Sequence, residues 1–322
     1  MTAAPFVALG NVTIDDLVFA DGSTMWCVPG GNSIYSALGM AVWEDKPRII
    51  APIGPEYPAA ILRDRIDLSR CRQIERNLRN WGLYEEDGTR VFTFRTKMQN
   101  WLDFCPTVAD LGEGPYANCH LAPLPWQLHI GLAQALRAKG ARLISLDPDE
   151  RNIHSLDRAS LRQLLGEVDL FLPSRQEANA IFPGAGPLDA LRLLRELAPE
   201  LPVIVVKCGA DGALAHRAGS DSYIRVPAVA TSVVDPTGAG DAFCGGALVG
   251  LARTGDLVEA LLHGAVSASF AVAATGPAGL IEATPELAGQ RLDDLRSRVE
   301  VRAFPGATTP FQQPLRSSFQ EA

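Results

Sequence analysis

The stretch from Val233 to Leu251 reads VVDPTGAGDAFCGGALVGL, and the interpretation of the whole chain begins here. Small residues surround one carboxylate, Asp241, and an apolar segment rich in Ala and Gly follows it. Glycines allow a tight turn and a close approach of a ligand to the backbone. The start of a helix presents free N–H groups and the positive end of the helix dipole. The stretch therefore predicts a strand ending before Asp235, a Gly-rich turn, and a helix whose start binds an anion.

This arrangement of residues matches the needs of phosphoryl transfer. The transferred group requires donors aimed at its developing charge in a dry site, and a nearby carboxylate can accept a proton from the attacking hydroxyl. A bare GAGD also fits a simple helix cap. The ordered run Asp-Pro-Thr-Gly-Ala-Gly-Asp is more specific, so we interpret Asp241 as catalytic together with Gly238, Ala239 and Gly240.

Composition narrows the possible partners. The 322 residues carry a net charge of -8 without a basic run, so nucleic acid is not expected as a partner. The six cysteines form no CxxC pair and are typical of reduced thiols. The segment 260–281 lacks charged residues but is only weakly apolar, which predicts a buried helix and no membrane span. No signal peptide is evident, so a cytoplasmic protein is expected.

The pattern along the chain predicts an α/β fold in one domain, 1–322. From about Ala117 onward, short apolar runs alternate with helical segments, which indicates a mostly parallel sheet covered on both faces. Two hairpins are expected earlier, over approximately 16–29 and 80–98, projecting as a small β-lid. The residues 304–322 are rich in Pro, Ser and Gln and predict a loosely ordered tail.

The string DPTGAGDAF closely resembles the C-terminal motif of the ribokinase-like (PfkB) family of carbohydrate and nucleoside kinases. The resemblance implies a three-layer α/β/α domain with a small β-lid, ATP and Mg²⁺ as cofactors, and a sugar as substrate. It also implies that the lid closes to exclude water and often forms a homodimer interface.

Other segments extend the resemblance to the substrate side. LGNVTIDDLV resembles the family's first strand and places Asp15 on substrate hydroxyls. PGGNSIYSALG resembles the Gly-Gly segment at the sugar, and Tyr35 stands where the family usually has Asn. SLDPDER resembles Asp-x-Asn-x-Arg, with Asp147 and Arg151 matched and Asp149 in place of Asn. The substrate-binding residues implied are Asp15, Gly30, Gly31, Asn32 and Arg151.

Further matches concern the nucleotide and metals. VVKCGADGA resembles the family's strand and loop beside the nucleotide, and FLPSRQEAN resembles Asn-x-x-Glu, whose Glu acts on Mg²⁺ through water. AVAATGPAGL resembles the loop that, with an Asp, holds K⁺ in potassium-activated members. The nucleotide-binding residues implied are Lys207, Gly209, Gly212 and Ser174, which replaces the family's Asn. The metal residues implied are Glu177 for Mg²⁺, and Asp235, Ala274 and Gly276 for a monovalent cation.

Three functions stay open on the sequence. The first is an ATP-dependent kinase acting on a hydroxymethyl group of a sugar or sugar derivative. The second is a nucleoside kinase of the same fold, in which Tyr35 and Trp26 stack on a base. The third is a catalytically silent relative that only binds a sugar or nucleotide, motivated by the departures at Tyr35, Asp149 and Ser174. A nicotinamide dehydrogenase and a Walker-type NTPase are disfavoured, since neither GxGxxG after the first strand nor GxxxxGK[ST] occurs.

The expected lid carries two basic residues, Arg95 and Lys97, on the same side of a strand. They fit either recognition of an acidic sugar or a solvated strand face, and we favour the solvated face.

Overall fold

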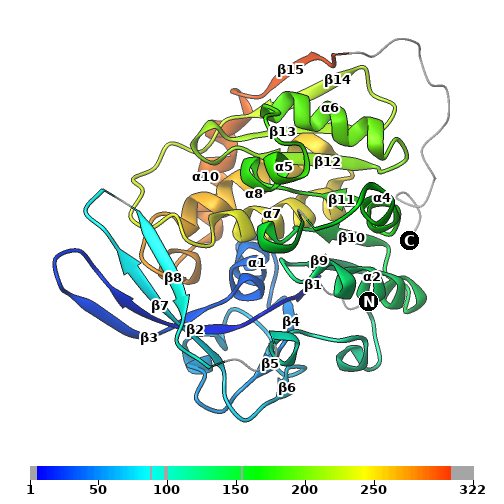
Figure 1. Cartoon of the computed structure of the whole chain (residues 1–322). Coiled ribbons are helices and arrows are strands. Elements are labelled where there is room, and N and C mark those ends of the chain that lie inside the picture. The colour runs from blue at the N-terminus through cyan, green and yellow to red at the C-terminus, as the bar shows by residue number, and fades with distance from the viewer. Residues whose placement is uncertain (1–5, 88, 98–100, 154, 306–322) are drawn as a thin grey trace.

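The computed structural model describes residues 6–87, 89–97, 101–153 and 155–305, and Figure 1 shows its arrangement. A nine-stranded sheet forms the centre, with the order β15-β14-β13-β12-β11-β10-β9-β1-β4. Its six parallel strands are β1 (Phe6–Leu9), β4 (Arg48–Ile50), β9 (Asn118–Leu121), β10 (Leu143–Leu146), β11 (Leu170–Phe171) and β12 (Val203–Lys207). The antiparallel edge consists of β13 (Ala213–Arg217), β14 (Ser222–Val226) and β15 (Glu300–Ala303).

Helices cover both faces of this sheet. Successive side chains of a strand point to opposite faces, and in β12 Val205 enters one hydrophobic core whereas Ile204 enters the other. The first core packs against α1 (Asn32–Ala41), α7 (Ala239–Thr254), α8 (Leu257–Ala271), α9 (Ala278–Ile281) and α10 (Pro285–Arg296). The second packs against α2 (Trp126–Ala138), α3 (Glu150–Ile153), α4 (Arg158–Gly166), α5 (Arg175–Ile181) and α6 (Pro187–Leu197). The expected three-layer α/β/α structure is confirmed.

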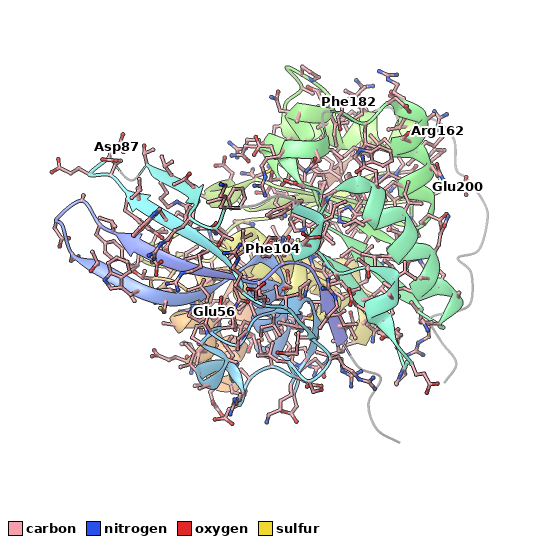
Figure 2. The ribbon with its side chains drawn as sticks, turned by 60° about the horizontal axis from the view of Figure 1, so that its bottom comes forward. Glu56, Asp87, Phe104, Arg162, Phe182 and Glu200 are labelled. Atoms are coloured by element: carbon pink, nitrogen blue, oxygen red, sulfur yellow. The ribbon has the colours of Figure 1, made fainter. Side chains whose placement is uncertain are left out.

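A separate four-stranded sheet, the lid, has the order β3-β2-β7-β8. Its strands are β2 (Thr13–Val18), β3 (Thr24–Gly30), β7 (Leu78–Tyr84) and β8 (Arg90–Phe94). The sheet joins two hairpins through parallel pairing of β2 with β7. It extends away from the main body in Figure 1, and Asp87 marks its far end in Figure 2. The expected small β-lid is confirmed, although its strands start a few residues earlier than expected.

The remaining elements are short. The strands β5 (Pro52–Ile53) and β6 (Arg72–Gln73) pair with each other. Four 3₁₀ turns, η1 (Ala59–Leu62), η2 (Trp101–Phe104), η3 (Val108–Leu111) and η4 (Gly209–Asp211), complete the described elements. The segment 260–281 forms α8 and α9, and no helix in the described ranges has the length and apolar character needed to cross a membrane.

Two expectations about the C-terminal third need correction. The strand expected before Asp235 is wrong, because β14 ends at Val226 and a loop follows. The edge beside β14 is taken by β15, so Val233 and Val234 have no strand to pair with and are 62% and 57% exposed. The tail expected over 304–322 needs correction at its first residue, because Phe304 is buried and stacks on His216. Residues 306–322 of that expected tail lie outside the described part of the chain.

Candidate active site

The Gly-rich turn leads into α7 as expected. Gly238 caps the helix with φ 74°, a left-handed conformation in which other residues are strained. A Cβ at Gly238 would also lie 2.1 Å from the ring of Tyr35, so Tyr35 packs directly against the turn. Asp241 is the third residue of α7, and its side chain opens into a cavity.

The run of Ala and Gly after Asp241 serves packing. α7 lies between α1 and α8, and its small residues let the three backbones approach closely. A Cβ at Gly245 would meet the Ser36 carbonyl oxygen of α1 at 2.0 Å. One at Gly246 would meet Ser267 of α8 at 2.4 Å. This packing fixes the first turn of α7, and with it Asp241, on a rigid support.

Asp241 belongs to a group of acidic side chains with one lysine. Burial raises the pKa of Asp241 to about 7, Lys207 opposes this rise, and Glu177 adds to it. Burial and the Asp147 carboxylate likewise raise the pKa of Glu177 to about 7. Burial raises the pKa of Asp147 to about 6 against the opposing effect of Lys207. An ionised Asp241 near pH 7 is suited to accept a proton.

Lys207 is tied to Asp147 and not directed at a free anion. Its Nζ lies 2.5 Å from Asp147 Oδ2, and both side chains are buried. Burial lowers the pKa of Lys207, but Asp147, Cys244 and Glu177 together raise it by more, so the net pKa is raised. A Cβ built on Gly240 would lie 3.4 Å from Lys207 Nζ, so the ammonium also sits beside the start of α7.

The acidic residues Asp147 and Glu177 are suited to bind a magnesium ion whose other ligands come mainly from a nucleotide. Asp147 Oδ1 is buried and has no hydrogen-bond partner, which leaves an acceptor for a cation. Glu177 lies near, although its carboxylate also accepts the Ser174 N–H at 2.5 Å in a capping box at the start of α5. No cluster of three or more His, Cys, Asp or Glu residues forms a metal cage among the described residues. Mg²⁺ usually needs only one or two carboxylates beside substrate phosphates.

A cavity of about 380 Å³ brings most of the expected substrate residues together. Its lining includes Asp15, Gly31, Asn32, Arg151, Gly238 and Asp241. A second hollow, of about 500 Å³, is lined by Lys46, Arg63 and Gln73 among others, and contains none of the expected site residues. We place the candidate site in the first cavity, because the polar groups of the Gly-rich turn converge there.

Asp15 faces this cavity from the lid strand β2. It accepts the Asn80 side-chain N–H at 2.9 Å, and burial raises its pKa to about 6 although Thr13 and Asn80 stabilise the ionised form. A Cβ at Gly30 would meet Asp15 Oδ2 at 2.1 Å, so Gly30 makes room for the carboxylate. Gly31, with φ 108°, lies against the backbone of Asn11.

Asn32 and Arg151 have partners within the protein. The Asn32 side chain accepts the Asn11 N–H at 2.8 Å and donates to the Pro123 carbonyl at 2.7 Å, joining the loops at the cavity. Arg151 is paired with Asp149 at 3.3 Å, and its guanidinium lies 5.4 Å from the centre of the Trp101 ring. Arg151 is 63% exposed at the cavity mouth and is therefore accessible to a ligand.

The two glycines after β12 differ in their surroundings. Gly209 has φ 59° and open space around its Cα, whereas a Cβ at Gly212 would meet the Val226 carbonyl oxygen at 2.0 Å. Gly212 therefore permits close pairing of β13 with β14. Ser174 caps α5 and pairs by an isolated bridge with Lys207, which places it beside the same loop.

Asp235 is buried and surrounded by donors, which does not fit a monovalent cation. Its oxygens accept bonds from Thr237, from Gly276 N–H, and from two lid side chains, Tyr84 and Arg90. Gly276 directs its N–H at Asp235, whereas a cation needs oxygen lone pairs. The role expected for Ala274 stays a prediction.

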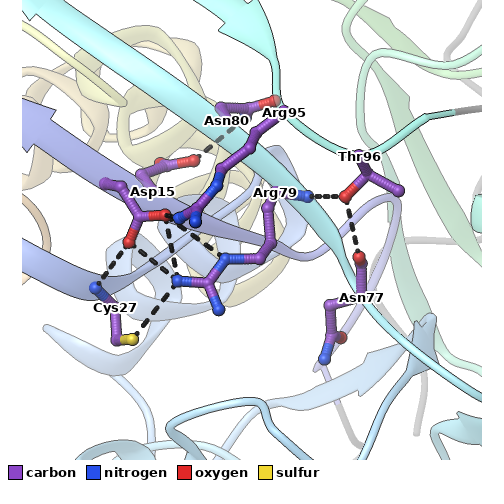
Figure 3. A network of polar contacts seen from close by, with 8 residues as sticks. Asp15, Cys27, Asn77, Arg79, Asn80, Arg95 and Thr96 are labelled. Carbon is purple, nitrogen blue, oxygen red and sulfur yellow. Dashed lines mark hydrogen bonds and ion pairs between the residues drawn. The ribbon is translucent and has the colours of Figure 1, made fainter.

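Another lid carboxylate, Asp16, does not line the cavity and is neutralised by Arg79 and Arg95, whose network of polar contacts Figure 3 shows. It is fully buried, pairs with Arg79 at 2.8 Å and with Arg95, and accepts the Cys27 N–H. The guanidinium of Arg95 also lies 4.7 Å from the centre of the Trp81 ring. Arg95 is 42% exposed and Lys97 is exposed as well, so both lie on the solvated face that we favoured, and Arg95 also pairs with the buried carboxylate of Asp16.

Sequence reasoning missed the lid residues Asn80 and Arg90, and it did not predict that Tyr84 of the lid and Thr237 of the turn bond to Asp235. Tyr84 and Arg90 stand opposite each other in the β7–β8 hairpin, on either side of the expected turn. That spacing was a signal that they lie together, but nothing local indicates that they reach Asp235.

Comparisons with known proteins agree with this fold and site. The model of the pfkB family carbohydrate kinases matches residues 15–284. The chain therefore belongs to the PfkB family of carbohydrate kinases, which are phosphotransferases with the ribokinase-like fold.

Two curated relatives differ in their substrates. The chain is 26% identical over 262 residues to a cytidine kinase of Thermococcus kodakarensis, covering 80% of this chain and 92% of that one. It is 27% identical over 265 residues to a fructokinase of Escherichia coli, covering 77% and 84%.

Two solved structures share the fold. An Escherichia coli structure in complex with ATP and Mg²⁺ has a TM-score of 0.72 at 18% identity, covering 90% of this chain and 99% of that one. A fructokinase double mutant of Vibrio cholerae O395 with fructose, ADP and a potassium ion has a TM-score of 0.71 at 18% identity, covering 90% and 98%.

Proposed function

We propose that this kinase transfers the γ-phosphoryl group of ATP to a hydroxymethyl group of a sugar or sugar derivative, with Asp241 as general base. One observation carries the proposal. Asp241, at the first turn of α7, and Asp15, on the lid, line one cavity. One carboxylate can therefore hold the hydroxyls of an acceptor while the other takes a proton from its reacting hydroxyl.

The acceptor is oriented before the proton moves. Asp15 accepts hydrogen bonds from the hydroxyls of the acceptor. Gly30 leaves room for the Asp15 carboxylate, and Gly31 lines the cavity beside it. Asn32 holds the loops that form this wall, and Arg151 contacts the acceptor or a phosphate at the mouth. Positioning of this kind lowers the barrier by removing the entropy cost of the encounter.

The proton of the reacting hydroxyl passes to an Asp241 carboxylate oxygen as the hydroxyl attacks the γ-phosphate in line. A base with a pKa of about 7 is about half ionised at pH 7, and its ionised form is basic enough to accept the proton. The N–H groups of Gly238, Ala239, Gly240 and Asp241 at the start of α7 stabilise the charge that develops on the phosphoryl oxygens.

The nucleotide lies on the other side of α7, near the ends of β11 and β12. Gly209 offers an open backbone to it, and Ser174 and Gly212 shape the same loop region. The positive charge of Lys207 offsets part of the negative charge of the acidic side chains, most directly that of Asp147. Glu177 and the unpartnered oxygen of Asp147 would hold Mg²⁺, which neutralises phosphate charge when bound.

A nucleoside is the second candidate acceptor. Aromatic side chains of Tyr35, Phe92, Phe94 and Trp101 line the same cavity, and such rings stack on bases. One of the relatives is a cytidine kinase. The cavity beside Asp15 is therefore lined by aromatic side chains suited to a base as well as by polar groups suited to hydroxyls.

The test is ADP formation by purified protein against matched panels of sugars and nucleosides at saturating Mg·ATP. We expect at least one sugar to raise ADP formation well above the rate without acceptor. A response confined to nucleosides would assign the second candidate. No response to either panel, with ATP binding intact, would refute both and leave the binding-only relative.

We also propose a homodimer formed through the lid. The lid exposes several large apolar side chains, among them Trp26 at 56%, Val91 at 48% and Met25 at 42%. Burial of such a surface favours association. Light scattering of the protein and of Trp26→Ser tests this, and a monomeric mass for the unsubstituted protein refutes it.

A further inference from the structure

We propose that Arg90 is a built-in counterion of Asp235, in the position that a monovalent cation takes in potassium-activated kinases, so that this enzyme works without potassium. Arg90 acts as a positioning residue. It reaches Asp235 from the lid and thereby links lid closure to the Gly-rich turn.

The surroundings of Asp235 leave no place for a metal ion. Oδ1 accepts the Thr237 N–H at 2.9 Å, the Thr237 hydroxyl at 2.6 Å and Arg90 Nη1 at 3.3 Å. Oδ2 accepts the Tyr84 hydroxyl at 2.8 Å and the Gly276 N–H at 3.3 Å. The side chain is only 2% exposed. A cation at this carboxylate would have to displace the guanidinium of Arg90.

A counterion at this position has a clear physical purpose. Asp235 lies three residues before Gly238, whose turn is proposed to bind phosphate. A buried carboxylate without a partner is strongly unfavourable, and its negative charge would oppose a phosphoryl group nearby. A guanidinium remains charged at every accessible pH and offers several fixed donors, so it can replace a bound cation permanently.

The contact also fixes the conformation of the turn. Arg90 Nη1 donates to the Thr237 hydroxyl, which in turn donates to Asp235 Oδ1. Thr237 immediately precedes Gly238, the cap of α7. The bond from Arg90 therefore holds Thr237, which lies one residue before the amides proposed to bind the phosphoryl group.

The β7–β8 hairpin of the lid holds Arg90 in place. Arg90 at the start of β8 pairs across the hairpin with Tyr84 at the end of β7. The Tyr84 ring lies 5.0 Å from that of Phe19 and 6.4 Å from that of Phe92, so aromatic packing supports the pair. Because both side chains belong to the lid, Asp235 is neutralised only while the lid lies against the turn.

The first test measures ADP formation in KCl, NaCl and tetramethylammonium chloride at a constant ionic strength of about 0.1 M. The unsubstituted enzyme is expected to have the same kcat in all three salts within about twofold. Arg90→Gln is expected to lose roughly 10²-fold in kcat in tetramethylammonium, the scale for removal of one charge-stabilising group. Added K⁺ or guanidinium should restore at least about tenfold, because each can fill the vacated position.

Three further variants separate charge from structure. Arg90→Lys keeps the charge and is expected to retain most activity without added K⁺. Tyr84→Phe removes a hydrogen bond but no charge, and is expected to lower kcat without creating a response to K⁺. Arg192→Gln removes an arginine from an exposed pair with Glu196 on α6 and serves as the matched control with unchanged kcat.

A second readout needs no acceptor and stands even if the sugar or nucleoside panel fails. Thermal unfolding of the unsubstituted protein is expected to be the same in K⁺ and tetramethylammonium. Arg90→Gln is expected to gain about 2 °C in Tm from K⁺ at ten times its Kd. Activation of the unsubstituted enzyme more than about tenfold by K⁺ would overturn the inference. Full activity of Arg90→Gln in tetramethylammonium, or a loss that neither lysine nor any cation repairs, would overturn it as well.

Discussion

Replacing Asp241 with asparagine is expected to lower activity and raise stability at the same time. Loss of the general base slows turnover by roughly 10²–10⁴-fold. Affinity for the nucleotide changes little, because the amides of the turn are kept. The gain in stability follows from the environment of the carboxylate, since burial raises its pKa from 3.8 to about 7.

The size of the stability effect follows from that shift. A pKa raised by folding means that the ionised form is less stable in the native protein, so stability falls as pH rises from 3.8 to about 7. About three pKa units correspond to an upper limit of about 4 kcal/mol. Asp241 opens into a cavity that solvent can enter, so we expect a gain of only about 1–2 kcal/mol for Asp241→Asn at pH 8. The gain fades as pH falls toward 4.

The assay combines steady-state ADP formation with urea unfolding at pH 8 and pH 5. Asp189→Asn is a matched control, because Asp189 occupies the same third position in α6 and is exposed. Near-normal kcat in Asp241→Asn would refute the base assignment. A loss of stability at pH 8 would refute the reasoning about burial, since it would mean that the charge of Asp241 holds the fold together.

Three further substitutions test the same site. Lys207→Met leaves Asp147 buried without its partner and is expected to cost about 3–5 kcal/mol in urea unfolding; a loss below about 1 kcal/mol would contradict the pair. Gly238→Ala places a Cβ 2.1 Å from Tyr35 at φ 74°, so we expect a lower Tm and a lower kcat, and unchanged values of both would argue against a tightly packed turn. Asp15→Asn weakens bonds to the acceptor and is expected to raise its KM by roughly 10–10²-fold while the KM for ATP stays within about twofold; equal rises in both would place Asp15 outside the acceptor site.

Local chemistry allowed the sequence alone to predict the parts of the site that lie close together in the chain. Gly238 and Asp241 are three residues apart, and their conformation depends on a turn and a helix start that neighbouring residues encode. The alternation of apolar runs and helical segments predicted the layered α/β fold, because buried parallel strands need helices on both faces. Strand edges were less predictable, and the strand expected before Asp235 proved to be a loop.

Tertiary structure decided the contacts that complete the site. Arg90 meets Asp235 across 145 residues and Tyr84 meets it across 151, and no local period encodes such a meeting. Asp15 and Asp16 are neighbours in the sequence, yet one faces the cavity and the other is neutralised by two arginines. Alternation along β2 separates them, but only the packing of the lid determines which face meets the acceptor.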